Sequence, residues 1–259
     1  MLRVQSSDGT TIAYERFGVG PPLLILGGSL ADHNFYLPLA HEFASDFTVY
    51  PVDRRGRGDS GDTPPYDVSR EVDDVAAIVA EAGGRVHVYG HSAGSALALR
   101  AAAEGVGINR LVLADPPFTS PGDNEAAARA EHAEQMQRIK QLNAAGDYRA
   151  SVKFFLSGYG LPDEALEEML SSPAGGSMIA SAQVLPYDYA MLGDGLVPTE
   201  LAANVLVPTL VLAAEEQPST ARALVDVLPN AELLLAPAST HELPPSEIAA
   251  LISPFLRQR

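Results

Sequence analysis

A serine flanked by glycines stands where an expected strand meets an expected helix. The pentapeptide Gly90-His91-Ser92-Ala93-Gly94 follows the apolar residues 86–89 and opens the helix-compatible segment 93–104. A nucleophile on such a sharp turn needs small neighbours, because its backbone is strained and packs closely on the next strand and helix. The first amides of the helix would face Ser92 and favour negative charge on a reacting oxygen. This context predicts that Ser92 is a nucleophile.

Strand and helix signals alternate along the chain and would position this turn at the edge of a sheet. Short, mainly apolar runs predict strands at 11–17, 23–26, 47–52, 86–89, 110–114, 209–213 and 232–236. Helix-compatible segments lie between them at 35–44, 68–82, 93–104, 220–228 and 246–256. Buried strands that alternate with helices indicate an α/β fold, with a doubly wound, mostly parallel sheet between two helical layers.

One long segment interrupts the alternation. Residues 118–204 contain no convincing buried strand, whereas 124–145 and 162–170 have helical composition. We call residues 118–204 the cap segment and expect a helical insertion over the carboxyl edge of the sheet, before the last two strands. The predicted core then consists of residues 1–117 and 205–259. Large side chains of the cap segment are expected to line an apolar pocket or to pack within the cap: Phe154, Phe155, Tyr159, Met178 and Tyr187.

Several segments together resemble the α/β-hydrolase superfamily, and the resemblance covers nearly the whole chain. Residues 90–94 resemble its nucleophile elbow, and residues 24–29 resemble its strand and oxyanion loop. Residues 53–60 resemble the family segment D-x-R-G-x-G-x-S. Residues 207–212 and 228–241 resemble the late strands that precede the acid and histidine loops. The resemblance implies the α/β-hydrolase fold and is less specific for the reaction.

His241 is the predicted general base. A serine hydroxyl becomes a good nucleophile when an imidazole accepts its proton and later returns it to the leaving group. The family order of nucleophile, acid and histidine places the base after the last strand, where His241 stands. The remaining histidines fit this position less well: His33, His41, His87, His91 and His132.

The acid that orients His241 has more than one candidate. The family pattern puts Gln217 where an aspartate is expected, and a carboxamide cannot balance the charge of an imidazolium. Glu215 and Glu216 are adjacent and would need a shift of the loop. Asp115 follows the preceding strand, a position from which some superfamily members present the acid. We therefore expect Asp115, with a late glutamate or no acid at all as alternatives.

The oxyanion donors implied by the resemblance are the backbone amides of Ala93 and Ser29. Gly27 stands where the family usually has a histidine, which removes no amide donor. The charged residues between 53 and 59 form a conspicuous cluster, Asp53, Arg54, Arg55 and Asp59. We interpret this cluster as a structural turn with internal ion pairs and assign it no catalytic role.

Composition excludes several functional classes. The chain has 259 residues, 46% hydrophobic and 19% charged, a composition typical of a globular protein. It contains no cysteine, so disulfides, thiolate metal sites and cysteine catalysis are excluded. Its formal charge of −16 would repel phosphate backbones and anionic lipid, so we expect a small-molecule substrate rather than nucleic acid or membrane. With neither a signal-peptide pattern nor an apolar run of about 18 residues, we expect a cytoplasmic protein.

These observations predict a cofactor-independent serine hydrolase of a small ester, thioester or lactone. Paired-histidine metal motifs and phosphate-binding glycine loops are absent from the sequence, so neither a metal nor a cofactor is expected. Serine at the nucleophile position argues against epoxide hydrolase or dehalogenase chemistry, which needs a carboxylate there. Two alternatives remain open: lyase, cyclase or perhydrolase chemistry with the same Ser92–His241 pair, and a non-catalytic protein that binds a small molecule.

Overall fold

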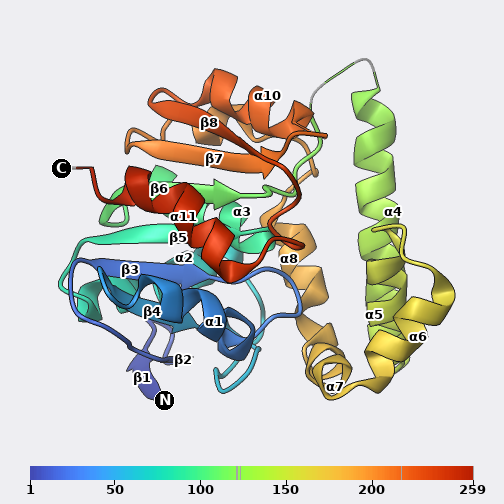
Figure 1. The fold of residues 1–259 in the computed structure, drawn as a ribbon. Coiled ribbons are helices and arrows are strands. Elements are labelled where there is room, and N and C mark those ends of the chain that lie inside the picture. The colour runs from blue at the N-terminus through green and yellow to red at the C-terminus, as the bar shows by residue number, and fades with distance from the viewer. Residues whose placement is uncertain (121, 123, 217, 259) are drawn as a thin grey trace.

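An eight-stranded sheet forms the centre of the computed structural model, which describes residues 1–120, 122, 124–216 and 218–258 (Figure 1). In chain order the strands are β1 (Leu2–Gln5), β2 (Thr11–Tyr14), β3 (Pro22–Leu26), β4 (Thr48–Val52), β5 (Val86–His91), β6 (Ile108–Ala114), β7 (Thr209–Ala214) and β8 (Ala231–Ala236). Their order across the sheet is β1-β2-β4-β3-β5-β6-β7-β8. The pairs β1–β2 and β2–β4 are antiparallel. The remaining neighbours, in the order β4-β3-β5-β6-β7-β8, pair in parallel, which confirms the predicted α/β class.

Helices cover both faces of the sheet, so that the parallel strands β3, β4, β5 and β7 are buried on both sides. Along β3, Leu23 and Ile25 belong to one apolar cluster, and Leu24 and Leu26 belong to the other. The first cluster is closed by α1 (His33–Phe43) and α11 (Pro245–Leu256). The second is closed by α2 (Val68–Glu81), α3 (Ala93–Ala103), α9 (Thr199–Ala202) and α10 (Ser219–Val227).

Local sequence explains where these helices begin. Asp67 caps α2, because its carboxylate accepts a hydrogen bond from the amide of Ser69 at 2.8 Å. The buried residues Val72, Val75 and Val79 then recur on one face of that helix and pack against the sheet. The strand that leads into the nucleophile turn is therefore held between helical layers and has little freedom to move.

Between β6 and β7 the chain forms a separate helical layer. Its helices are α4 (Glu125–Ala144), α5 (Tyr148–Ser157), α6 (Asp163–Ser171), α7 (Pro173–Ala180), the 3₁₀ helix η1 (Ala182–Val184) and α8 (Leu185–Met191). In Figure 1 they lie beside the end of the sheet at which the parallel strands finish. They share an apolar cluster that includes Ile139, Val152 and Leu185 together with Leu30 from the loop after β3. The cap segment thus contacts the core at the loop that approaches the nucleophile.

Some elements differ from the sequence-based expectation. β1 was not predicted, because it is a mostly exposed edge strand of only four residues. The strand predicted at 11–17 ends at Tyr14, and beyond it Phe17 makes only an isolated bridge to Val49. Within the described residues, no helix combines the length and hydropathy that a membrane span requires.

Candidate active site

Ser92 lies on a strained turn between β5 and α3. Its backbone adopts φ 51° and ψ −124°, a conformation that costs free energy for a non-glycine residue. A side chain at Gly94 would overlap the carbonyl oxygens of Leu26 and Gly27. A Cβ at Gly90 would come within 2.7 Å of the Gly94 carbonyl oxygen. The two flanking glycines are therefore required by close backbone packing, as the sequence indicated.

Asp115 and His241 lie next to each other, although 126 positions separate their numbers. Asp115 follows β6 with a positive φ of 45°, and its Oδ2 is 3.4 Å from Nδ1 of His241. The same Oδ2 accepts hydrogen bonds from the Thr240 amide at 2.6 Å and the Ser239 hydroxyl at 2.7 Å. Ser239 Oγ in turn lies 3.1 Å from Nδ1 of His241. Ser239 and Thr240, which sequence reasoning did not select, thus complete the surroundings of this carboxylate.

The Asp115 carboxylate is held in its ionised form. Burial raises its pKa, but hydrogen bonds from His241, Thr240 and Ser239 outweigh that effect and lower the pKa to about 2. An ionised carboxylate beside an imidazole stabilises the imidazolium that forms when the ring accepts a proton. This local environment is what a charge partner for His241 requires.

The other candidate acids lie elsewhere. Glu215 and Glu216 are exposed, and in the described residues neither makes a hydrogen bond or ion pair with His241. The amide of Glu215 is hydrogen-bonded to the carbonyl of Ala236, which continues the pairing of β7 with β8. Gln217 is outside the described residues.

No hydrogen bond joins Ser92 to His241 among the described residues. The His241 ring instead packs against the ring of His91, with centroids 4.3 Å apart, and its side chain is 41% exposed. Since His91 precedes Ser92 directly, the base and the nucleophile lie on adjoining parts of the site. Catalytic hydrogen bonds are often long without substrate and tighten only in the reacting complex.

His91 is part of a buried chain of hydrogen bonds that reaches the oxyanion loop. The Gly28 amide donates to the Tyr36 hydroxyl at 2.8 Å, and that hydroxyl lies 2.8 Å from Nδ1 of His91. Because the hydroxyl proton is free to point at the ring, Nδ1 acts as the acceptor and Nε2 carries the hydrogen. Burial and the neighbouring His241 lower the pKa of His91 to about 3, so the ring is neutral.

The loop after β3 lies directly against the nucleophile. A Cβ at Gly28 would be 3.1 Å from Cβ of Ser92 and 3.6 Å from its Oγ. The Gly28 amide is already bonded to Tyr36, so it is not a free donor. Ser29 and Ala93 both line the same cavity as Ser92, and the role of their amides as oxyanion donors stays a prediction.

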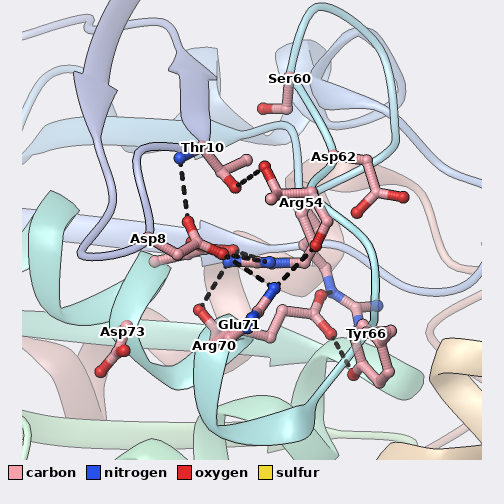
Figure 2. Close-up of polar contacts among 12 residues, drawn as sticks. Asp8, Thr10, Arg54, Ser60, Asp62, Tyr66, Arg70, Glu71 and Asp73 are labelled. Atoms are coloured by element: carbon pink, nitrogen blue, oxygen red, sulfur yellow. Dashed lines mark hydrogen bonds and ion pairs between the residues drawn. The ribbon is translucent and has the colours of Figure 1, made fainter.

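In the charged cluster of residues 53–59, Arg54 and Arg55 are buried, but their ion pairs are not internal to the turn. Arg54 Nε donates to Glu71 of α2 at 2.8 Å, and Glu71 also accepts from the Tyr66 hydroxyl (Figure 2). Arg55 pairs with Asp74 at 2.7 Å. The expectation of internal ion pairs was therefore wrong, because the partners come from α2 and from the cap segment. Asp53 accepts from the Asp59 amide within the turn at 2.9 Å, and it also accepts from the backbone amide of His33 at the start of α1 at 2.6 Å.

A cavity of about 260 Å³ opens beside Ser92. Its lining comes from the oxyanion loop, the nucleophile turn and the cap segment, including Ser29, Phe155, Tyr159, Asp188, Tyr189 and Gly195. Of the five cap residues considered from the sequence, Phe155 and Tyr159 line this cavity. The other three do not: Phe154 and Met178 pack in the cap cluster, and the ring of Tyr187 stacks on Tyr66 at 3.9 Å.

His91, Asp115 and His241 each offer one potential metal-ligand atom, and these atoms lie within 4.8 Å of one another. Two of these residues already interact, and the third hydrogen-bonds Tyr36. These three residues are therefore the candidate base, the carboxylate beside it and the histidine whose ring packs against it.

The fold and the site together define a class: an α/β protein with a serine on a sharp strand-to-helix turn, beside a cavity that residues of the cap segment help to line. Residues 23–251 match the model of the alpha/beta hydrolase family, and the chain belongs to that family. A solved alpha/beta hydrolase from Sphaerobacter thermophilus is 40% identical, with a TM-score of 0.87, and the alignment covers 98% of this chain and 100% of that one. The protein is therefore an α/β hydrolase.

Two further relatives carry more specific names. N-formylmaleamate deformylase from Pseudomonas putida is 36% identical over 122 residues, which cover 45% of this chain and 46% of that protein. The match thus spans about half the length of this curated relative. The enol-lactonase from Burkholderia xenovorans LB400 has 19% identity and a TM-score of 0.69 over 99% of this chain and 100% of its own, which shows the shared fold.

Proposed function

We propose that the protein is a cofactor-independent serine hydrolase that cleaves a small ester, thioester or lactone through an acyl-enzyme on Ser92. The observation that carries the proposal is the strained turn that presents Ser92 to the 260 Å³ cavity beside the Asp115–His241 pair. A nucleophile, an imidazole and an ionised carboxylate on adjoining loops are the groups that acyl transfer requires.

In the proposed reaction Ser92 Oγ attacks the acyl carbon while His241 accepts the hydroxyl proton. The carbonyl oxygen becomes an oxyanion and accepts hydrogen bonds from the amides of Ser29 and Ala93. His241 then returns the proton to the leaving oxygen or sulfur as its bond to the acyl carbon breaks. A water molecule, deprotonated by the same imidazole, attacks the acyl-enzyme and releases the acid and free Ser92.

Asp115 is the proposed acid of this triad. Its support is the 3.4 Å separation from Nδ1 of His241 and the hydrogen bonds that keep it ionised. We propose that the cap segment covers the site, which would exclude bulk water and limit the acyl group to a small size.

A second candidate reaction is the hydrolysis of an amide, such as an N-formyl amide. It is favoured by the partial match to a deformylase, at 36% identity. The proposed steps are the same, except that His241 protonates a leaving nitrogen. An amide panel beside the ester panel separates the two reactions.

The test is covalent labelling with a fluorophosphonate probe, followed by mass spectrometry. Wild type should carry one adduct on Ser92, and Ser92→Ala should carry none. His241→Ala and Asp115→Asn should label much more slowly, with unchanged circular dichroism as the folding control. An unlabelled wild type would overturn the proposal in favour of a binding protein. Labelling without turnover of any ester or amide would indicate lyase, cyclase or perhydrolase chemistry.

A further inference from the structure

One wall of the cavity is a single face of α4. Ala128, Glu131, His132 and Gln135 line the cavity, and their spacing of three, four and seven positions puts them on one side of the helix. Ser92 lines the same cavity. Three of the four side chains of this face are polar, whereas the sequence suggested an apolar pocket.

His132 has a fixed orientation on this wall. Its Nε2 is 3.2 Å from the backbone carbonyl oxygen of Tyr189, which can only accept, so Nε2 carries the hydrogen. In the neutral ring Nδ1 is then an acceptor, and in the described chain no hydrogen bond occupies it. The ring packs directly against Gly195. Any side chain at that position would collide with it, because a Cβ there would lie 2.8 Å from Cγ of His132.

The neighbouring side chains also leave an acceptor unused. Tyr189 donates its hydroxyl hydrogen to Oε1 of Gln135 at 3.3 Å. Gln135 in turn donates through Nε2 to one carboxylate oxygen of Glu131 at 3.1 Å. The Tyr189 hydroxyl and one N–H of Gln135 are therefore directed at protein acceptors, and no hydrogen bond among the described residues uses the second carboxylate oxygen of Glu131.

The described residues that line the cavity include no lysine or arginine. Asp188, which also lines the cavity, is bonded to Arg54, Arg57 and the hydroxyl of Ser29, so its neighbours direct their donors away from a ligand. The remaining hydroxyls, of Tyr159 and Thr119, can accept as well as donate.

We propose that the α4 wall binds an N–H donor on the substrate, such as a carboxamide or an ammonium group, and selects against a carboxylate. His132 Nδ1 and the Glu131 carboxylate accept the hydrogen bonds, whereas a substrate carboxylate would be repelled by the charge of Glu131 and would meet no lysine or arginine among the described lining residues. This inference rests on the proposed function, because the same cavity contains Ser92. His132 and Glu131 are then specificity-determining residues for the acyl part of the substrate.

Three methyl esters of nearly equal shape test the proposal: methyl succinamate, methyl levulinate and monomethyl succinate. They end in a carboxamide, a methyl ketone and a carboxylate, so only the first offers N–H donors. Hydrolysis is followed by titration of the released acid. We expect kcat/KM for methyl succinamate to exceed that for methyl levulinate by about tenfold and that for monomethyl succinate by about 100-fold.

Variants identify the wall as the source of this preference. His132→Phe and Glu131→Ala each remove one acceptor and should each lower the succinamate-to-levulinate ratio, and the double variant should bring it close to one. Glu134→Ala, at an exposed position on α4 outside the cavity lining, should leave the ratio unchanged. Equal rates for the three esters in wild type, or a ratio that survives both variants, would overturn the inference while the hydrolase proposal stands. If no ester is cleaved and Ser92 does not label, the proposed function itself fails.

Discussion

Arg57 donates through one guanidinium nitrogen to both carboxylate oxygens of Asp188, at 2.8 and 2.9 Å, across 131 positions of the sequence. Arg57 follows β4, whereas Asp188 belongs to α8 of the cap segment. Arg54 reaches the same carboxylate at 2.9 Å, and the Ser29 hydroxyl is hydrogen-bonded to it. Burial raises the pKa of Asp188, but the two guanidinium groups lower it below its ordinary value. This carboxylate therefore connects the cap segment, the core and the oxyanion loop.

Asp188→Asn should destabilise the protein strongly. It would leave Arg54 and Arg57 with a buried, uncompensated charge, and breaking a buried pair in this way costs about 3–5 kcal/mol. Urea unfolding measures the loss. The control is Asp46→Asn, which breaks a 2.6 Å pair with Arg257 whose partners are 40% and 56% exposed. That change should cost no more than about 1 kcal/mol, and equal losses in the two variants would contradict the argument.

Ser239→Ala should lower activity without changing substrate binding. Ser239 Oγ donates to Asp115 at 2.7 Å and lies 3.1 Å from Nδ1 of His241, closer than Asp115 itself. Its loss removes one bond to a charged group, so we expect kcat to fall by about tenfold at unchanged KM. Ser239→Thr retains a hydroxyl and should recover most of the rate. A change in KM with kcat unchanged, or no recovery with threonine, would show that Ser239 does not hold the ring.

His91 should make stability depend on pH in a defined direction. Its pKa is about 3 in the folded protein and 6.5 as an unperturbed group, so below pH 6.5 the unfolded chain gains a proton that the folded chain does not. The contribution of His91 to the free energy of unfolding is then fully present above pH 6.5, and it decreases as the pH falls toward the pKa of the folded state. Between about pH 7.5 and pH 5 the wild type should lose about 2 kcal/mol more than His91→Asn. Asparagine keeps an acceptor for Tyr36 but does not titrate. Parallel pH profiles for the two proteins in urea unfolding would refute this assignment.

The sequence was sufficient for the features that depend on local geometry. The elbow was recognisable because glycine is needed at two positions four residues apart: Gly94 approaches the backbone of Leu26 and Gly27, and Gly90 approaches the carbonyl oxygen of Gly94. The α/β alternation was recognisable because strands buried on both faces are continuously apolar. The edge strand β1 lacks that pattern and was missed.

Features that depend on distant contacts were not predictable. Whether Asp115 or a late glutamate approaches His241 depends on how three loops converge, and no local pattern encodes that convergence. No sequence motif marks Asp188, because its ion-pair partner Arg57 is 131 positions away in the chain. Tyr36 was also missed, because its hydroxyl meets His91 only after α1 has packed onto the sheet.

Two glycine substitutions test the packing argument for the elbow. Gly94→Ala would place a methyl group against the backbone oxygens of Leu26 and Gly27, which cannot move without disturbing β3 and the oxyanion loop. Such overpacking costs about 1–3 kcal/mol, and displacement of the oxyanion loop should also abolish labelling of Ser92. Gly176 lies in α7, is exposed, and a Cβ there meets nothing within 4 Å. Gly176→Ala should therefore raise the free energy of unfolding by about 0.5–1 kcal/mol, because alanine loses less backbone entropy than glycine in a helix. Thermal unfolding and fluorophosphonate labelling measure both effects. If Gly94→Ala were as stable and as reactive as wild type, close backbone packing would not be the reason for glycine at the elbow.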